Sequence, residues 1–86
     1  SKGGLIQLNR WLSTTLAPDV RVNAISPGGV ARGQPEAFME RYEARTPLGR
    51  MACEDDFRGA IAYLASDLST YVTGHVLNVD GGWSAW

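Results

Sequence analysis

Two short apolar segments, one in the first third of the chain and one near its end, most constrain the fold. Residues 20–25 are rich in β-branched side chains and are followed by a Ser-Pro-Gly-Gly turn sequence. Residues 75–79 contain Val76, Leu77 and Val79, which make that segment apolar on both faces. Such a strand is typical of a parallel sheet that helices cover on each side. We therefore expect two parallel strands joined by a right-handed helical crossover.

Three other segments carry helical patterns. Residues 4–17 repeat leucine at spacings of three and four, and Pro18 ends that helix because proline cannot donate to the helical ladder. Residues 35–44 form a short helix with Pro35 at its first position, followed by a loop at residues 46–49. Residues 54–65 begin with three acids, which the positive end of a helix dipole stabilises. The buried stripe expected on this helix consists of Phe57, Ala60, Ile61, Leu64 and Ala65.

These elements do not complete an open sheet. A parallel strand with free edges leaves ladder groups and apolar faces unmatched. The composition, 44% hydrophobic and 20% charged over 86 residues, is nevertheless that of a globular protein. We expect either that the biological chain is longer or that another polypeptide supplies the remaining strands. Residues 1–86 are then one segment of a single α/β domain.

Charge, cysteine content and hydropathy exclude several classes of function. A formal net charge of −1 with scattered cations argues against nucleic acid as a partner. The single Cys53 excludes an intrachain disulfide, and neither it nor the lone His75 has partners for a metal site. No apolar run is long enough to cross a bilayer. The sequence therefore predicts no metal and no membrane partner, and the expected location is the cytoplasm.

Both ends of the chain and its first strand carry motifs of one family. Residues 71–82, Tyr-Val-Thr-Gly-His-Val-Leu-Asn-Val-Asp-Gly-Gly, resemble the last strand of the short-chain dehydrogenase/reductase family. The opening Ser-Lys-Gly-Gly resembles the end of that family's Tyr-x-x-x-Lys motif, and residues 22–28 resemble its Arg-Val-Asn-x-x-x-Pro-Gly segment. The resemblance, which runs from Lys2 to Gly82, implies the C-terminal part of a doubly wound parallel-sheet (Rossmann-type) domain. The family's tyrosine is expected four residues before Lys2.

The resemblance also implies the site residues. Lys2 is predicted to be catalytic and cofactor-binding, since the family's lysine hydrogen-bonds the nicotinamide ribose and lowers the pKa of the tyrosine one turn earlier. Pro27 and Gly28 are predicted to pack against the nicotinamide, and the backbone near Val30 to hydrogen-bond the carboxamide. Without the resemblance, a terminal lysine is a solvated charge and Pro-Gly-Gly is a turn. Arg32 replaces the family's usual threonine, and we expect it to be a solvated loop charge rather than a phosphate or substrate ligand.

Residues 31–46 correspond to the family's substrate-binding lid. On its helix we expect Phe38, Met39 and Tyr42 to pack into the core rather than against substrate. The C-terminal Trp83 and Trp86 require cover, because an exposed aromatic pair is costly.

Other residues of the family pattern are expected to be structural. Arg50 is predicted to connect loops, and Asp67 to lie near a helix end. Asp80 is predicted to form a turn after the last strand rather than to act as an acid.

The function implied is an NAD- or NADP-dependent oxidoreductase. It transfers a hydride between the nicotinamide and a carbonyl or secondary alcohol of a small molecule, as a dimer or tetramer of identical chains. The residues that choose between NAD and NADP lie outside this sequence, and the segment alone is expected to be inactive. The alternative is a non-catalytic truncated module that assembles with a full-length dehydrogenase partner.

Overall fold

A computed structural model describes residues 1–86, and its elements confirm the α/β prediction. The helices are α1 (Lys2–Thr15), α2 (Glu36–Arg45) and α3 (Asp55–Ala65), with single 3-10 turns η1 (Asp67–Ser69) and η2 (Trp83–Ala85). The strands β1 (Ala24–Pro27) and β2 (Val76–Val79) pair in parallel, with Ala24 opposite Val76 and Pro27 opposite Val79. No helix is long and apolar enough to cross a membrane.

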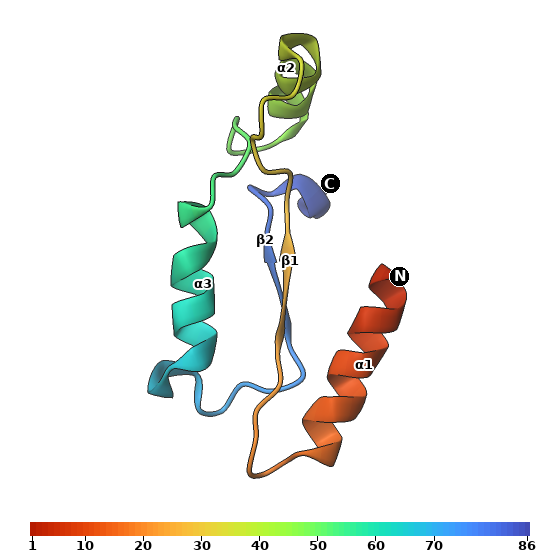
Figure 1. The fold of residues 1–86 in the computed structure, drawn as a ribbon, viewed down its shortest axis with the longest axis vertical. Coiled ribbons are helices and arrows are strands. Elements are labelled where there is room, and N and C mark those ends of the chain that lie inside the picture. Colours follow the sequence, from red (N-terminus) through yellow and green to blue (C-terminus); the bar gives the residue numbers. More distant parts are fainter.

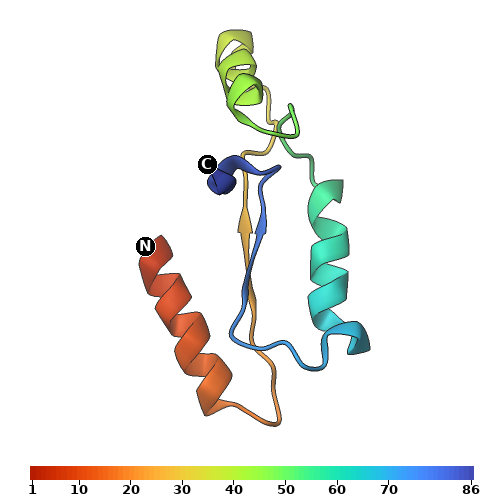
Figure 2. The same cartoon turned by 180° about the vertical axis from the view of Figure 1, so that it is seen from behind.

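The two strands lie between two helices, as Figures 1 and 2 show from opposite sides. α3 packs along the pair through the half-buried Phe57, Ala60 and Leu64. α1 lies on the other side and diverges from the strands toward its N-terminus (Figure 1). α2 lies beyond the carboxyl ends of both strands, next to the C-terminus of the chain (Figure 1).

The boundaries of β1 and α1 differ from the sequence prediction. β1 begins at Ala24 rather than at residue 20, because the side chain of Asn23 replaces a backbone partner: its Oδ1 accepts from the His75 N–H at 3.0 Å. α1 begins at Lys2, where the Ser1 Oγ accepts from the Gly4 N–H, and it ends at Thr15 rather than at residue 17. The residue before a proline disfavours helical geometry, so α1 stops short of Pro18.

A network centred on Arg21 joins the start of β1 to the end of α3. Its guanidinium donates to the carbonyls of Leu64, Ser66 and Val72 at 3.1–3.2 Å and to the Ser69 Oγ at 3.0 Å. Ser69 is 1% exposed, and its hydroxyl donates in turn to the end of α3. This cation therefore has a structural role that the sequence analysis did not assign.

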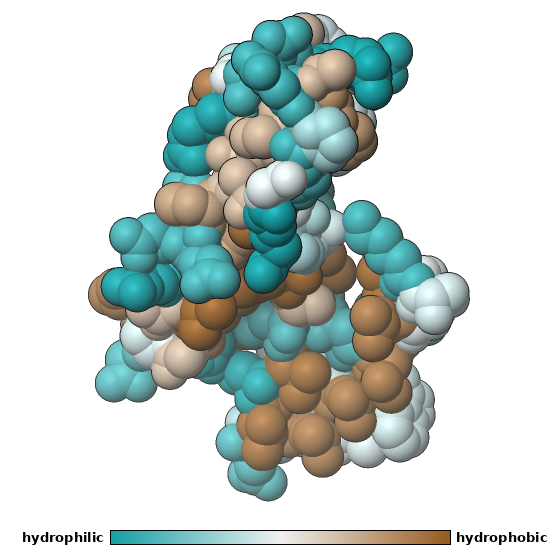
Figure 3. Space-filling view, turned by 45° about the horizontal axis from the view of Figure 1, so that its top comes forward, coloured by the Kyte–Doolittle hydropathy of each residue, from teal (hydrophilic) through white to brown (hydrophobic).

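Few side chains are buried. Of 86 residues only five are, and Met51 is the single hydrophobic one among them. The radius of gyration is 15.1 Å, whereas a compact chain of this length has about 12 Å. Hydrophobic side chains form a broad patch on the face in Figure 3. Contrary to prediction, Ile61, Phe38 and Ala65 are exposed, with 57% of the Ile61 surface and 41% of the Phe38 surface accessible, because two strands cannot cover the apolar faces of the helices around them.

Candidate functional site

The carboxyl ends of β1 and β2 open into a groove between α1 and the strands. Its volume is about 740 Å³, within the range typical of small-molecule sites. Leu5, Ile6 and Leu12 line it from α1, and Ala24 and Val76 line it from the strands. In open parallel sheets ligands bind just beyond the carboxyl ends of the strands, so this groove is the candidate site.

Three of the four predicted site residues line this groove. Lys2 is an exposed residue in the first turn of α1, and Pro27 and Gly28 lie at the end of β1. Val30 does not line the groove: it follows two residues later and forms an isolated parallel bridge with Ala52. The fold thus places the terminal lysine on the same groove as a loop that is more than twenty residues away in sequence.

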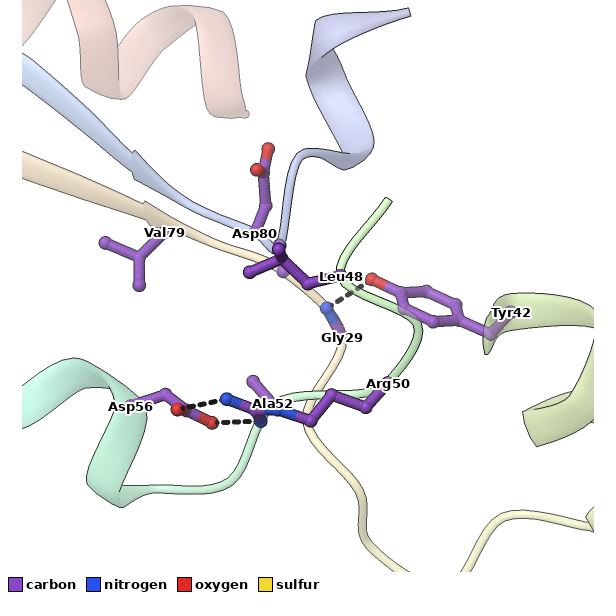
Figure 4. A pocket seen from close by; sticks show the side chains of 10 residues that line it. Gly29, Tyr42, Leu48, Arg50, Ala52, Asp56, Val79 and Asp80 are labelled. Atoms are coloured by element: carbon purple, nitrogen blue, oxygen red, sulfur yellow. Dashed lines mark hydrogen bonds and ion pairs between the residues drawn. The ribbon is translucent and has the colours of Figure 1, made fainter. Parts of the chain in front are cut away.

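Residues 28–31, the strand-end loop, are held by hydrogen bonds on three sides. The Gly28 N–H donates to the Val79 carbonyl at 2.9 Å, and the Ala31 N–H donates to the Ala52 carbonyl at 2.9 Å. The Gly29 N–H donates to the Tyr42 hydroxyl at 2.6 Å (Figure 4). These contacts leave one N–H of the loop without a partner.

That free donor is the N–H of Val30. The Gly29 carbonyl, in the same peptide unit, accepts from the Ala52 N–H at 2.9 Å. This peptide is trans, so its C=O and N–H point in opposite directions, and the Val30 N–H points away from Ala52. The strand-end loop therefore keeps one backbone donor, the Val30 N–H, that no group of the chain accepts.

Glycine is required at two positions of this loop because of close contacts. A Cβ on Gly28 would lie 2.8 Å from the Asp80 Cα, at the end of the neighbouring strand. A Cβ on Gly29 would lie 2.7 Å from the Tyr42 ring. A side chain at Gly28 would displace the loop, and with it the Val30 N–H, whereas one at Gly29 would displace the loop or the Tyr42 ring.

Tyr42 of α2 connects the strand-end loop to the C-terminal segment. Its ring stacks on Trp83 with centroids 4.5 Å apart and an interplanar angle of 15°. Tyr42 and Met39 are half-buried, whereas Phe38, predicted to be in the core, is exposed. Tyr42 therefore covers part of Trp83.

Trp86, by contrast, is 86% exposed, although its Nε1 donates to the Arg45 carbonyl at 2.8 Å. The predicted requirement for cover is thus met in part for Trp83, while Trp86 keeps most of its surface open.

The predicted structural roles of Arg50 and Asp80 are confirmed. Arg50 forms two 2.7 Å hydrogen bonds with Asp56, and this contact, together with the Cys53 N–H, lowers the pKa of the Asp56 carboxyl well below its usual range (Figure 4). Asp80 accepts from the Ser84 hydroxyl at 2.6 Å and from the Gly82 N–H, and these bonds lower its pKa. Both acids thus hold turns around the site.

The remaining charged side chains, and the side chains of types that can bind metals, form no second candidate site. Arg32 lies 3.9 Å from Glu54, and both side chains are largely exposed, as predicted for a solvated loop charge. Asp67 lies in the first turn of η1. No group of three or more His, Cys, Asp or Glu side chains could hold a metal ion. The chemistry of this chain therefore centres on the groove and the strand-end loop.

Comparisons with known proteins agree on one family. A family model described as enoyl-(acyl carrier protein) reductase matches residues 1–84. The ribulose-forming D-arabinitol 2-dehydrogenase of Candida tropicalis is 44% identical over 96 residues, which cover 100% of this chain and 34% of that protein. The L-tagatose-forming galactitol 2-dehydrogenase of Cereibacter sphaeroides is 43% identical, with 100% of this chain and 37% of that protein covered.

Solved structures agree as well. The crystal structure of a short chain dehydrogenase from Leptospira borgpetersenii with bound NAD+ has a TM-score of 0.93 at 44% identity, covering 96% of this chain and 33% of that one. The chain belongs to the short-chain dehydrogenase/reductase family. This membership confirms the resemblance in the motifs at both ends and the assignment to part of a Rossmann-type domain. The chain spans about a third of the length of the short-chain dehydrogenases that it matches.

Proposed function

We propose that residues 1–86 are the C-terminal segment of a single dinucleotide-binding domain in a nicotinamide-dependent oxidoreductase. The protein would transfer a hydride between NAD or NADP and a carbonyl or secondary alcohol of a small molecule. The observation that carries the proposal is the free Val30 N–H, held in a fixed direction at the end of β1. The chain covers only about a third of the length of each of these relatives, which supports its assignment as one segment of a longer domain.

The nicotinamide would lie against the end of β1. The Val30 N–H has the chemistry to donate to the carboxamide oxygen, and Gly28, which has no side chain, allows the ring to approach the backbone. Pro27 would form an apolar surface beside it, since its ring lies at the end of β1 and it carries no N–H. The NAD+ bound to the Leptospira protein supports this choice of cofactor class.

Lys2 would act on both the cofactor and the reacting oxygen. Its ammonium can donate to the ribose hydroxyls, and a positive charge one helical turn after a tyrosine stabilises the phenolate of that tyrosine. The nicotinamide itself supplies or accepts the hydride. The contribution of this chain is to orient the ring through the strand-end loop and to lower the pKa of the acid–base tyrosine through Lys2.

The names of two relatives support a secondary alcohol as the substrate class. Both the arabinitol and the galactitol enzymes are 2-dehydrogenases of polyhydroxylated compounds. Assembly with further copies is part of the proposal, because α1 exposes Leu5 (65%) and Trp11 (61%). Such apolar faces require cover from the rest of the domain or from another subunit.

The experiment begins with the intact protein that contains this sequence. Reduction of NAD+ and NADP+ is measured with a panel of secondary alcohols, and the residue four places before Lys2 is identified. Lys2→Met is expected to lower kcat by about a hundredfold or more. Arg10→Met, which removes an exposed cation from the same helix, is the matched control. Wild-type turnover in Lys2→Met, or a residue other than tyrosine at the upstream position, would overturn the proposal.

A non-catalytic module that assembles with a full-length dehydrogenase is the second candidate, and the uncovered apolar faces favour it. Intact mass separates the two. The enzyme requires a mass of roughly three times 9.3 kDa, as the coverage of its relatives implies. A purified protein of 9.3 kDa bound to a larger dehydrogenase would establish the module instead.

A further inference from the structure

We propose that Tyr42 is a positioning residue for the cofactor: its hydroxyl fixes the strand-end loop so that the Val30 N–H is held for the nicotinamide carboxamide. This inference rests on the proposed function. Tyr42 would not itself touch the reacting atoms. It would act through the peptide units on each side of Gly29.

The Gly29 N–H and the Val30 N–H belong to neighbouring peptide units. The Tyr42 hydroxyl is the sole acceptor of the Gly29 N–H, at 2.6 Å, and the peptide unit that follows carries the free Val30 N–H. Each peptide unit is planar, so the two dihedral angles of Gly29 alone relate these two N–H directions. Glycine is the least restricted residue at those angles. Ala52 holds the peptide unit after Gly29 through its carbonyl, and the Tyr42 hydroxyl is the contact that holds the peptide unit before it.

Open volume lies on both sides of the strand-end loop. Gly28, Gly29 and Tyr42 line both the large groove and a separate cavity of about 110 Å³ behind the loop (Figure 4). The loop thus borders open volume on both sides, although its glycines contact Asp80 and Tyr42 closely. With open volume on both sides, hydrogen bonds determine where Gly29 lies, and the Tyr42 hydroxyl provides the one that comes from a side chain.

Contacts near the end of β2 hold Tyr42 and its helix in place. Stacking on Trp83 holds its ring, and Trp83 begins the turn η2, which a short Asp80–Gly82 segment connects to the end of β2. The Leu48 N–H donates to the Gly81 carbonyl at 3.0 Å, which also joins the segment after α2 to the end of β2. The lid helix α2 is therefore connected to both strand ends, and its position is transmitted to the loop through one hydroxyl.

The test compares Tyr42→Phe with the wild type in the intact protein. Phenylalanine keeps the stacked ring and removes only the acceptor of the Gly29 N–H. We expect the KM and Kd for the nicotinamide cofactor to rise about two- to tenfold, the effect of one lost hydrogen bond. The kcat and the substrate KM should stay within about twofold, because the contact orients the cofactor in ground and transition states alike.

Tyr71→Phe is the matched control, since Tyr71 is fully exposed and its hydroxyl has no hydrogen-bond partner. It should leave every parameter unchanged. A second readout uses the thionicotinamide cofactor, whose sulfur is a weaker acceptor than the carboxamide oxygen. The penalty of Tyr42→Phe should shrink with that cofactor, because the contact with the Val30 N–H is already weakened.

The outcomes are distinct. Equal cofactor KM in Tyr42→Phe and wild type, or a penalty that is the same for both cofactors, would overturn the positioning role. Lower thermal stability without a change in cofactor KM would show that Tyr42 serves packing alone. If Tyr42→Phe does not fold, Trp83→Leu, which keeps the hydroxyl but removes the stacked ring, should raise cofactor KM in its place. Failure of the wild type to bind either nicotinamide cofactor would refute the proposed function instead.

Discussion

The two ends of β1 are built in different ways. At the amino end, Arg21 and Asn23 are surrounded by partners: Arg21 donates to four acceptors, and Asn23 pairs with both the Val72 carbonyl and the His75 N–H. At the carboxyl end two glycines follow the strand, the Val30 N–H is free, and the loop is held by backbone hydrogen bonds with Val79 and Ala52 and by the Tyr42 hydroxyl. The first end serves stability, and the second leaves polar groups available for a ligand.

The largest expected effect tests the amino end. Arg21→Met removes four hydrogen bonds to partly buried acceptors, and the carbonyls of Leu64, Ser66 and Val72 then keep only the donors that Ser69 and Asn23 provide. We expect the free energy of unfolding to fall by about 2–4 kcal/mol. Denaturant unfolding of the intact protein measures this change.

The control for this prediction is a surface arginine. Arg58→Met removes only a pair with Asp55 in which both side chains are at least 71% exposed, and it should change stability by less than about 0.5 kcal/mol. If the two variants are equally stable, the amino end is not the structural anchor, and the contrast between the two ends fails.

The second prediction tests the carboxyl end of β1 through a substitution at Gly28. Gly28→Ala places a methyl group 2.8 Å from the Asp80 Cα, a backbone atom that cannot yield easily. We expect a loss of about 1–3 kcal/mol in stability and weaker binding of the nicotinamide cofactor.

Gly59→Ala is the matched control, because Gly59 lies inside α3 with no atom near the added methyl group. Alanine is the better helix former, so this variant should gain about 0.5–1 kcal/mol. Thermal unfolding and cofactor titration of both variants check the pair. Normal cofactor affinity in Gly28→Ala would mean that the loop adapts and that its shape does not define the site.

The sequence predicted the elements whose signals are local. The parallel pairing of β1 and β2 follows from an apolar segment that needs cover on both faces, and the acids at the start of α3 mark its first turn. The motifs around Lys2 and Pro27 identified the family because they are short and contiguous. Each of these signals lies within about a dozen residues, although the paired strands themselves are far apart in sequence.

Contacts between distant residues were not predicted. The four acceptors of Arg21 lie 43 to 51 positions away, and Trp83 reaches Tyr42 only because the chain turns sharply after Asp80. The predicted burial of Ile61 and Phe38 was wrong for a related reason. Helical spacing shows which face is apolar, whereas burial depends on what lies against that face.

The smallest expected effect concerns pH and separates the two ends again. The acceptors of Arg21 are neutral carbonyls and a hydroxyl, so acid cannot titrate them. Near the carboxyl end, the Asp56 carboxylate accepts hydrogen bonds from the Arg50 guanidinium and from the Cys53 N–H. These bonds hold the segment that contains Ala52, and Ala52 forms a bridge with Val30 of the strand-end loop. Since Asp56 has a lowered pKa in the folded state, its contribution is fully present above about pH 4, the unfolded value.

That contribution is lost as the pH falls toward the folded pKa of Asp56, because protonation then removes the charge that Arg50 binds. Asp56→Asn should be less stable than the wild type at pH 7, and the difference should shrink steadily below about pH 4. Asp55→Asn, which removes an exposed acid paired only with Arg58, is the control. Hydrogen exchange locates the effect: in acid, the amides of Ala31 and Ala52 should lose protection before those of Ala24 and Gly74. Simultaneous loss at both ends would mean that the two ends of β1 open as one unit, and that the ionic contact has no separate role at the carboxyl end.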